Sequence, residues 1–405
     1  GPRTPMSNLS RTTLRIAHLA DTHLGYSGYG KSDPETGRNQ RAVDFESAFA
    51  HVIDDILTRE VDLVIHAGDV FHHTRPSWHT LALFVQQMRR LELAGIPAVV
   101  IAGNHDTPRL RTSGSLYSVM ELSLPRVRFM TGYATEEQPY PEFDMVVHGV
   151  PHGSLINPDP PLILPVHGQR NIVVTHGVAV GAKMAGSREQ GETELRGNMF
   201  DEDVDYVAMG HIHLRQTIGL NKVYSGSTER TSWGDQGATP GYALVSLGAP
   251  GDLAQVEYID TPARPMETLP AIDGADRTAR DLADMILDRA GALGKPDAMV
   301  RVELRSTPRP LFRETDAIVR RETGDNAWLI RLTVPGEALD PLGREGPSTM
   351  ADLNPLTLFG TFVEERRAAG EYEPVFAEAF GAHGKAVLER AIRNLEDATA
   401  NEAAG

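Results

Sequence analysis

The sequence is organised around one short stretch, Gly103-Asn104-His105-Asp106, which follows an apolar, β-branched run at 98–102. A proline precedes the run and a glycine ends it, so the pattern predicts a buried strand that stops in a turn. The turn carries an amide, an imidazole and a carboxylate within three residues. Because open α/β sheets place their chemistry just beyond the carboxyl ends of strands, this turn is a candidate functional site.

Four other predicted strands end in side chains of the same kinds. The residues at these four ends are Asp21 and His23, Asp69, His176, and His211 and His213. Positions two apart on an extended segment share a side, so Asp21 and His23 are expected to face one metal ion together. The same holds for His211 and His213 if that segment is extended. A single strand-end histidine is usually structural, but five such groups predict a metal centre.

The ligand types predict which metals this centre holds. The sequence contains no cysteine, so any ion must be held by nitrogen and oxygen atoms. Mixed imidazole and carboxylate ligands suit manganese, iron or zinc better than magnesium. So many ligands predict two ions about 3.5–4 Å apart, bridged by one carboxylate, an arrangement suited to in-line phosphoryl displacement. Asp69 is the expected bridge because it stands alone at the end of its strand.

Composition sets broader limits. The chain has 405 residues, enough for two or three domains, and a formal net charge of −16. The acidic balance argues against nonspecific coating of nucleic acid by the whole surface. It leaves a nuclease open, because bound divalent ions reverse the potential locally. No apolar stretch approaches membrane length, so we expect no membrane-spanning segment.

The order of elements predicts an α/β fold. Strands and helices alternate from 14 to 106, which indicates a mostly parallel sheet covered by helices. Short strands from 145 to 246 add a second sheet, giving a two-sheet sandwich flanked by helices, and the glycine-rich stretch 178–198 is read as a mobile loop. The predicted domains are a main domain at 12–260, a small α+β domain at 265–335 and a helical segment at 348–398.

At this point the motifs resemble a known family. Asp21-x-His23, Gly68-Asp69, Gly103-Asn104-His105-Asp106, Thr175-His176-Gly177 and Gly210-His211-x-His213 resemble, in this order, the motifs of the calcineurin-like metallophosphoesterase superfamily. The surrounding Asp44-Phe45, Val70-Phe71-His72 and Arg75-Pro76-Ser77 are similar to its DNA double-strand-break repair nuclease branch, which contains SbcD-type nuclease subunits. The resemblance is strong over about 14–260 and weaker beyond.

The resemblance implies a role for each site residue. One Mn²⁺ ion is implied at Asp21, His23, Asp69 and His213, and a second at Asp69, Asn104, His176 and His211. His105 is implied to protonate the leaving sugar oxygen, which suits an imidazole because it titrates near neutral pH. Asp106 would orient that imidazole, and His72 would lie near the site for exonuclease chemistry. As phosphate contacts on DNA we name Arg75, Arg109, Arg111 and Arg215.

The resemblance also implies a function and partners. It implies a DNA nuclease of double-strand-break repair, combining 3′-to-5′ exonuclease action on duplex ends with endonuclease action on single strands or hairpins. The small domain would cap the DNA, although acidic neighbours make its arginines equally consistent with a solvated face. An SMC-like ABC ATPase of the SbcC type is the implied partner, and a homodimer and a cytoplasmic, nucleoid-associated location are implied too. The apolar stripes after 356 would dock that partner or pack within the chain.

Two alternative functions stay open. The same metal site could serve a phosphodiesterase or phosphatase acting on small nucleotides, because fold and site do not fix the substrate. A structural subunit of a repair complex is the third possibility. The complete ligand set argues against it, because an inactive site usually loses ligands.

Overall fold

The computed structural model describes residues 13–108, 115–157, 161–184, 193–196, 199, 203–324, 330–335 and 373–402, with single positions between 356 and 367. The chain divides into two compact units, 1–335 with 341–343, and 336–340 with 344–405. In the described part of the chain, no helix combines the length and the apolar character that a membrane crossing needs.

The first unit contains two six-stranded sheets among its described residues. The first sheet has the order β14-β13-β1-β2-β3-β4, and the second has the order β11-β12-β10-β7-β6-β5. The strands of the first sheet are β1 Leu14–Leu19, β2 Leu63–His66, β3 Ala98–Ile101, β4 Val127–Met130, β13 Gly241–Leu247 and β14 Gln255–Asp260. Those of the second are β5 Glu136–Tyr140, β6 Met145–Val150, β7 Arg170–His176, β10 Tyr206–Gly210, β11 Gln216–Ile218 and β12 Lys222–Tyr224.

Alternation along the central strands explains why the sheets stack. In β1, Ile16 joins the apolar core between the two sheets, whereas its neighbour Ala17 faces the other side. In β3, Val99 and Val100 divide in the same way. Successive side chains of a strand point to opposite faces, so each central strand contributes side chains to two apolar cores. The predicted two-sheet sandwich is therefore confirmed.

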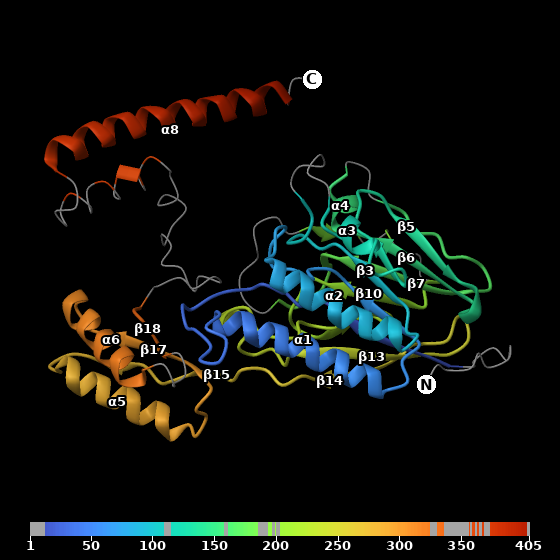
Figure 1. The fold of residues 1–405 in the computed structure, drawn as a ribbon, viewed down its shortest axis with the longest axis horizontal. Coiled ribbons are helices and arrows are strands. Elements are labelled where there is room, and N and C mark those ends of the chain that lie inside the picture. Colours follow the sequence, from blue (N-terminus) through green and yellow to red (C-terminus); the bar gives the residue numbers. More distant parts are fainter. Residues whose placement is uncertain are drawn as a thin grey trace. The chain divides into compact units, whose positions relative to one another are not determined.

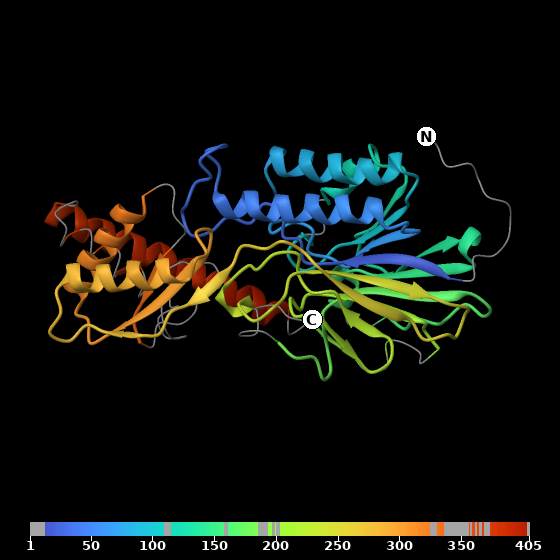
Figure 2. The same ribbon diagram turned by 90° about the horizontal axis from the view of Figure 1, so that it is seen from below.

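Two long helices cover the outer face of the first sheet. Helices α1 (Gln40–Thr58) and α2 (Trp78–Leu93) run side by side there (Figures 1 and 2). Phe49 of α1 and Phe84 of α2 have stacked rings in this core. The sequence predicts this helix from about Asp44, but α1 begins at Gln40 because the side chain of Asn39 accepts hydrogen bonds from the backbone of its first turn.

Several short or polar strands were not predicted. β5 contains Pro139 and lies at a sheet edge, where proline is tolerated. β14 lies at an edge of the first sheet, and its polar residues face solvent. The stretch 178–198, predicted as a loop, contains the paired strands β8 Val178–Ala179 and β9 Glu194–Leu195. These two-residue strands are too short to give a sequence pattern.

A third sheet follows in the same unit. Its parallel strands β15 Met266–Thr268, β16 Ile272–Asp273 and β18 Ile330–Thr333 all pair with β17 Met299–Arg305. Helices α5 Ala279–Ala292 and α6 Arg309–Thr323 pack on it around a separate apolar core. The other helices among the described residues of this unit are short, namely α3 Tyr117–Glu121, α4 His152–Leu155, and the 3₁₀ turns η2 Pro141–Phe143 and η3 Trp233–Asp235.

Most of what the structure describes in the second unit is helix α8, Pro374–Glu402. The helix continues through Gly384, whose backbone approaches the ring of Phe359 too closely for any larger residue. Phe359 also lies against Phe380, with 5.4 Å between the ring centroids. Of the predicted apolar stripes, Leu356 and Leu388 are half-buried, whereas the side chains of Phe362, Ile392 and Leu395 lie outside the described residues.

Candidate metal centre

Seven predicted ligands meet where the carboxyl ends of the central strands of both sheets converge. β1 and β2 of the first sheet run parallel, as do β7 and β10 of the second. Two groups of possible ligand atoms form there, each within 4.8 Å, and they are Asp21 with His23 and His213, and Asp69 with His176 and His211. Asn104 joins the second group through its side-chain oxygen. The structure thus brings together the whole set predicted from the sequence.

The backbone is strained at this centre. Among the described residues, nine other than glycine have a positive φ, and four of these are Asp21 at 53°, His23 at 40°, Asp69 at 54° and His211 at 95°. Such conformations cost about 1–3 kcal/mol each and persist only where the surroundings enforce them. Here hydrogen bonds between the turns after β1 and β2 hold these conformations. Asp21 N donates to Gly68 O at 3.0 Å, and His23 N donates to Asp69 O at 3.0 Å.

The conformation of His211 corrects one expectation. With φ at 95° the segment is not extended, so His211 and His213 do not face one ion together. His211 Nδ1 lies 3.1 Å from Asn104 Oδ1, whereas His213 Nε2 lies 3.1 Å from His23 Nε2. The two histidines therefore belong to different groups of ligand atoms.

Two glycines of the motifs are required by close approach. A Cβ atom on Gly103 would lie 2.1 Å from Asp69 Oδ1 and 2.5 Å from Asp69 N. A Cβ atom on Gly68 would lie 2.5 Å from His176 Nδ1, and its φ of 92° is unfavourable for other residues. The glycines that precede Asp69 and Asn104 thus allow the turns of β2 and β3 to touch.

The first group has the lone pairs that a cation needs. Asp235 Oδ2 lies 2.9 Å from His213 Nδ1, and since a carboxylate only accepts, the proton of His213 sits on Nδ1. The Nε2 lone pair of His213 then points at His23 Nε2, 3.1 Å away. Ligand atoms that share one ion at about 2.0–2.1 Å lie about 3.0–3.4 Å from each other. The spacing of these two nitrogens fits a common divalent ion.

The second group has the same property. His176 Nδ1 donates to Ala67 O at 2.8 Å, so Nε2 carries the lone pair of the neutral ring. This Nε2 lies 3.0 Å from Asn104 Oδ1 and 3.2 Å from Asp69 Oδ2, and both oxygens are acceptors. Three acceptors that converge need a cation or a proton. Burial lowers the pKa of His176, but the Asp69 carboxylate outweighs burial and raises it to about 9.

Asp69 contacts members of both groups. Its Oδ2 lies 3.9 Å from His23 Nε2 and 3.2 Å from His176 Nε2, and its Oδ1 accepts from the backbone N–H of His105 at 2.9 Å. Burial raises the pKa of the carboxyl, but the His176 and His105 imidazoles together hold that pKa well below its usual range. By contrast, burial raises the pKa of the other carboxyl group among the predicted ligands, that of Asp21, to about 7. Asp69 is therefore the carboxylate best placed to bridge two ions.

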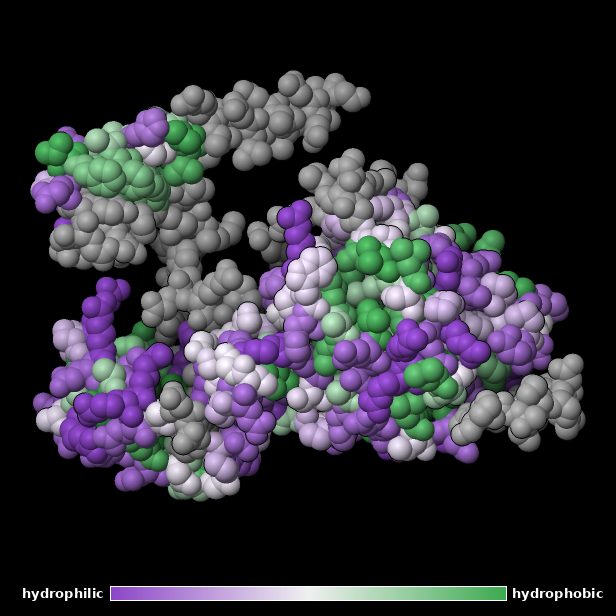
Figure 3. Space-filling model, viewed as in Figure 1, coloured by the Kyte–Doolittle hydropathy of each residue, from purple (hydrophilic) through white to green (hydrophobic). Residues whose placement is uncertain are grey.

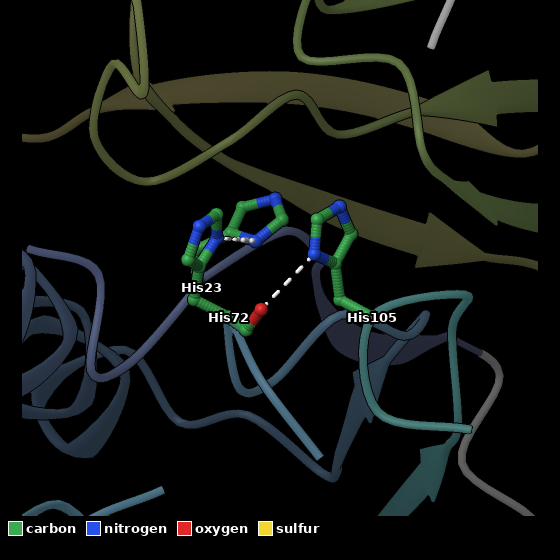
Figure 4. Close-up of side chains that lie close together, drawn as sticks. All are labelled: His23, His72 and His105. Carbon is green, nitrogen blue, oxygen red and sulfur yellow. Dashed lines mark hydrogen bonds between the residues drawn. The ribbon is translucent and has the colours of Figure 1, made fainter. Parts of the chain in front are cut away.

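A third histidine group lies beside the first. His72 Nδ1 lies 3.3 Å from His23 Nδ1, and the His72 and His105 rings are stacked with centroids 5.0 Å apart (Figure 4). His105 Nδ1 lies 3.0 Å from the carbonyl oxygen of His72, which fixes a proton on Nδ1. The Nδ1 side of the His105 ring therefore faces the backbone of His72. Both predicted histidines thus lie at the edge of the centre.

Asp106 makes several hydrogen bonds to the turns that follow β2 and β3. Its carboxylate accepts from Val70 N at 2.9 Å, from Gly103 N at 3.0 Å and from the hydroxyl of Tyr117. Burial and the charge of Asp69 raise its pKa to about 7. Asp106 therefore holds the β2 and β3 turns together, and its orientation of His105 stays a prediction.

Of the four arginines predicted to contact phosphate, Arg75 and Arg215 lie in the described part of the chain. Arg75 is exposed, and Arg215 forms an ion pair with Asp260 at 2.5 Å and lies over the ring of Tyr258. Arg109 and Arg111 lie outside the described residues.

Two further residues at the centre were not predicted as site residues. His152 follows strand β6, which is a sixth strand end, and burial with the neighbouring His176 lowers its pKa to about 4. Asp235 contacts His213 as described above. Burial raises the pKa of Asp235, but the charge of His213 and hydrogen bonds from Thr231 lower it to about 2. In the sequence, Asp235 shows only a helix-start pattern with Ser232, which does not indicate a site residue. His152 could have been predicted, because it directly follows the end of a strand.

Comparisons with known proteins agree with the geometry. Residues 14–215 match the family model described as calcineurin-like phosphoesterase. Proteins named DNA double-strand break repair protein Mre11 are similar to the chain. The one from Haloferax volcanii is 31% identical over 299 residues, covering 72% of this chain and 61% of its own. Those from Saccharolobus solfataricus and Methanosarcina mazei are 27% and 29% identical, covering 50% and 59% of this chain. The chain spans 61%, 50% and 37% of these three relatives, respectively.

Proposed function

Residues 14–215 of this chain form a calcineurin-like phosphoesterase domain, and from this premise we propose that the chain is a metal-dependent nuclease that hydrolyses phosphodiester bonds in DNA during double-strand-break repair. The names of its relatives support this substrate, because all three are DNA double-strand break repair proteins. We propose 3′-to-5′ action on duplex ends together with endonuclease action on single strands or hairpins.

One observation carries the proposal. Two groups of buried ligand atoms lie side by side and share Asp69, with the stacked pair His72 and His105 at their edge. Enzymes with two adjacent metal ions use such an arrangement to stabilise both the attacking and the leaving oxygen of a phosphate ester. A core that is merely structural does not need converging acceptors.

The donor atoms fit two divalent ions, for which we propose Mn²⁺. Asp21, His23, Asp69 and His213 would hold one ion, and Asp69, Asn104, His176 and His211 the other. Nitrogen and oxygen donors in this mixture suit Mn²⁺ better than Mg²⁺. When bound, the ions supply Lewis-acid polarisation of the phosphate and a lowered pKa of water.

The protein's own residues then handle the proton. In the hydrolysis a P–O bond to the water oxygen forms, the water releases a proton to the solvent, and the P–O bond to the leaving sugar oxygen breaks. His105 donates the proton that this oxygen requires, through the ring nitrogen that does not face the His72 carbonyl. The stacked ring of His72 and the His72 carbonyl keep His105 at the proper angle. For His72 itself we propose a role in the exonuclease reaction on duplex ends.

The decisive experiment is the degradation of 3′-labelled duplex DNA by the purified chain with Mn²⁺, Mg²⁺ or EDTA. We expect Mn²⁺-dependent release of nucleotides, which the His105→Ser variant loses by about 10²–10⁴-fold. The same variant keeps its Mn²⁺ affinity, because His105 is a proton donor and not a ligand. Loss of the metal in this variant would contradict the general-acid role.

A bis-nitrophenyl phosphate control separates the nuclease from its main alternative. Turnover of this small ester with DNA left intact, even in the presence of an ATPase partner, would support a small-nucleotide phosphodiesterase. Absence of both activities in protein that binds Mn²⁺ would support a structural subunit.

We propose the three parts of the chain as separate domains, at 12–260, 265–335 and 348–398. The separate apolar core of the third sheet supports the second, and its place after the phosphoesterase region supports a DNA-capping role. The exposed apolar side chains of α8, Val375 at 82% and Phe376 at 53%, support docking on an SMC-like ABC ATPase. Deleting residues 348–405 should abolish that association and leave the Mn²⁺-dependent activity.

A homodimer is proposed from the surface of the first unit. Figure 3 shows an apolar patch on the viewed face over the region of α2 and α3. On these helices and just after them, Trp78 is 87%, Val119 69% and Leu122 87% exposed. Exposed apolar patches mark interaction sites. Sedimentation of Leu122→Glu should then show a monomer where the unchanged chain shows a dimer.

A further inference from the structure

Asp235 controls which nitrogen of His213 carries the proton. Its Oδ2 lies 2.9 Å from His213 Nδ1, and only 5% of the Asp235 side chain is exposed. With the proton on Nδ1, the Nε2 lone pair is directed at His23. A carboxylate behind a metal-binding imidazole fixes its tautomer and orientation and increases its basicity. Asp235 lies 22 residues further along the chain than His213, on a different segment.

The carboxylate is itself held in place. The same Oδ2 accepts from Thr231 N at 2.9 Å and from Thr231 Oγ1 at 2.6 Å. Ser232 and Asp235 form a capping box around the turn η3, so the backbone of Asp235 is fixed as well. Asp235 therefore cannot rotate away from His213 without breaking several hydrogen bonds.

The segment 229–235 also touches the third sheet. The ring of Trp233 packs in an apolar cluster with Met266 of β15 and Met299 of β17, and only 6% of Trp233 is exposed. The guanidinium of Arg301, also on β17, lies 4.9 Å from the Trp233 ring centroid. Asp235, which lies two residues after Trp233 in the sequence, contacts His213 of the metal centre.

The opposite side of the segment touches the phosphoesterase region. Tyr26 donates from its hydroxyl to Thr231 O at 2.6 Å, and its ring lies 4.9 Å from that of His72. Arg41 donates to Arg230 O at 2.6 Å. The segment is thus held between the third sheet and the metal centre.

We propose that Asp235 is a positioning residue for His213, and that Trp233 makes this positioning depend on the packing of the third sheet against segment 229–235. The inference rests on the proposed function, because it takes His213 as a metal ligand. It makes the affinity of one of the two metal sites depend on the packing of the third sheet.

The test measures the metal-free tautomer and the metal affinity separately. In the metal-free chain labelled with ¹⁵N-histidine, His213 should show a protonated Nδ1, assigned by its absence in His213→Ala. Asp235→Asn should remove this preference, and it should weaken one Mn²⁺ site in calorimetry by about 10–100-fold. An unchanged tautomer with unchanged affinity would overturn the role of Asp235. A purely structural role would lower thermal stability without altering the tautomer.

A matched control is Asp205→Asn. Asp205 is also a buried aspartate that holds backbone N–H groups, those of Asn171 and Gly251, and it precedes strand β10 at the end away from the centre. This variant should lose stability and keep both Mn²⁺ affinities. An equal loss of Mn²⁺ affinity in Asp205→Asn would show that the effect of Asp235→Asn is general destabilisation.

Trp233→Ala tests the second half of the inference. It leaves Asp235 in place and removes the ring that contacts Met266 and Met299. We expect a fall of several-fold in Mn²⁺ affinity at one site and a broadened His213 signal. Unchanged values for both would overturn the dependence on the third sheet. Wild-type protein that binds two Mn²⁺ ions without cleaving DNA would contradict the proposed function alone, because the tautomer measurement needs neither metal nor DNA.

Discussion

The Nε2 atoms of His23 and His213 lie 3.1 Å apart, although the two residues are 190 positions apart in the chain. The proton of His213 sits on Nδ1 against Asp235, so a lone pair faces the other ring. Two nitrogens in this relation are stabilised by a cation between them. Metal binding should therefore stabilise the folded chain.

The first prediction concerns metal addition and removal. At an Mn²⁺ concentration of about 100 times the dissociation constant, each site should raise the free energy of unfolding by about 2.7 kcal/mol. His213→Ala should lose the contribution of one site, as measured by urea unfolding with Mn²⁺ and with EDTA. The exposed His167 provides a control, because His167→Ala should respond to Mn²⁺ as the unchanged chain does. Equal stabilisation of His213→Ala would exclude His213 as a ligand.

The second prediction concerns Gly103. In Gly103→Ala the new methyl group would lie 2.1 Å from Asp69 Oδ1, so the turn or the carboxylate must move. We expect loss of at least one Mn²⁺ site in calorimetry, because Asp69 contacts both groups of ligand atoms. Gly132→Ala is the matched control, since a Cβ atom there meets nothing within 4 Å. Retention of both sites in Gly103→Ala would contradict the close approach.

The third prediction separates holding the turns from catalysis at Asp106. Asp106→Asn replaces one acceptor oxygen with a donor, and it leaves a buried N–H group of Val70 or Gly103 without a partner. Such a loss costs about 1–3 kcal/mol, which urea unfolding of the metal-free protein would detect. Tyr117→Phe removes only the hydroxyl donor and should cost less. A stable Asp106→Asn protein that has lost only activity would support a direct role toward His105.

The fourth prediction concerns pH and Asp44. The carboxylate accepts two hydrogen bonds from Arg264, at 2.6 and 2.7 Å. Burial raises the pKa of Asp44, but the hydrogen bond and charge of Arg264, with those of Arg41, lower it below its ordinary value of 3.8. A lowered pKa stabilises the fold above pH 3.8 and ceases to do so as pH falls through the folded-state value.

Asp44→Asn should therefore lower the free energy of unfolding by about 1.5–3 kcal/mol at pH 7, the range for hydrogen bonds to charged groups. The difference from the unchanged chain should shrink as pH falls below 3.8, in urea titrations at each pH. Asp33 is half-buried and has a pKa lowered by hydrogen bonds from Thr36 and not by an ion pair, so Asp33→Asn is a control with a smaller effect. A constant difference across the pH range would exclude the ionised Asp44 as its source.

The amino-acid sequence was enough to predict the central sheets and the side chains that meet at their carboxyl ends. Apolar runs such as 98–101 form buried strands whatever their partners, and parallel strands bring their carboxyl ends to one edge. Residues at those ends, including Asp69 and His176, could therefore be assigned to one site before any contact was known. The edge strand β5 was missed because its polar residues and Pro139 give no such pattern.

The contacts of the individual site residues could be read only from the folded chain. The positive φ of His211 separates it from His213, and that conformation is enforced by contacts such as His211 N to the carboxylate of Asp21. The partners of Asp106 and Asp235 were equally hidden. Hydrogen bonds of these side chains join residues that are far apart in sequence, and their direction depends on how the two sheets stack and on where a neighbouring turn places its N–H groups. No periodicity or spacing along the chain records that information.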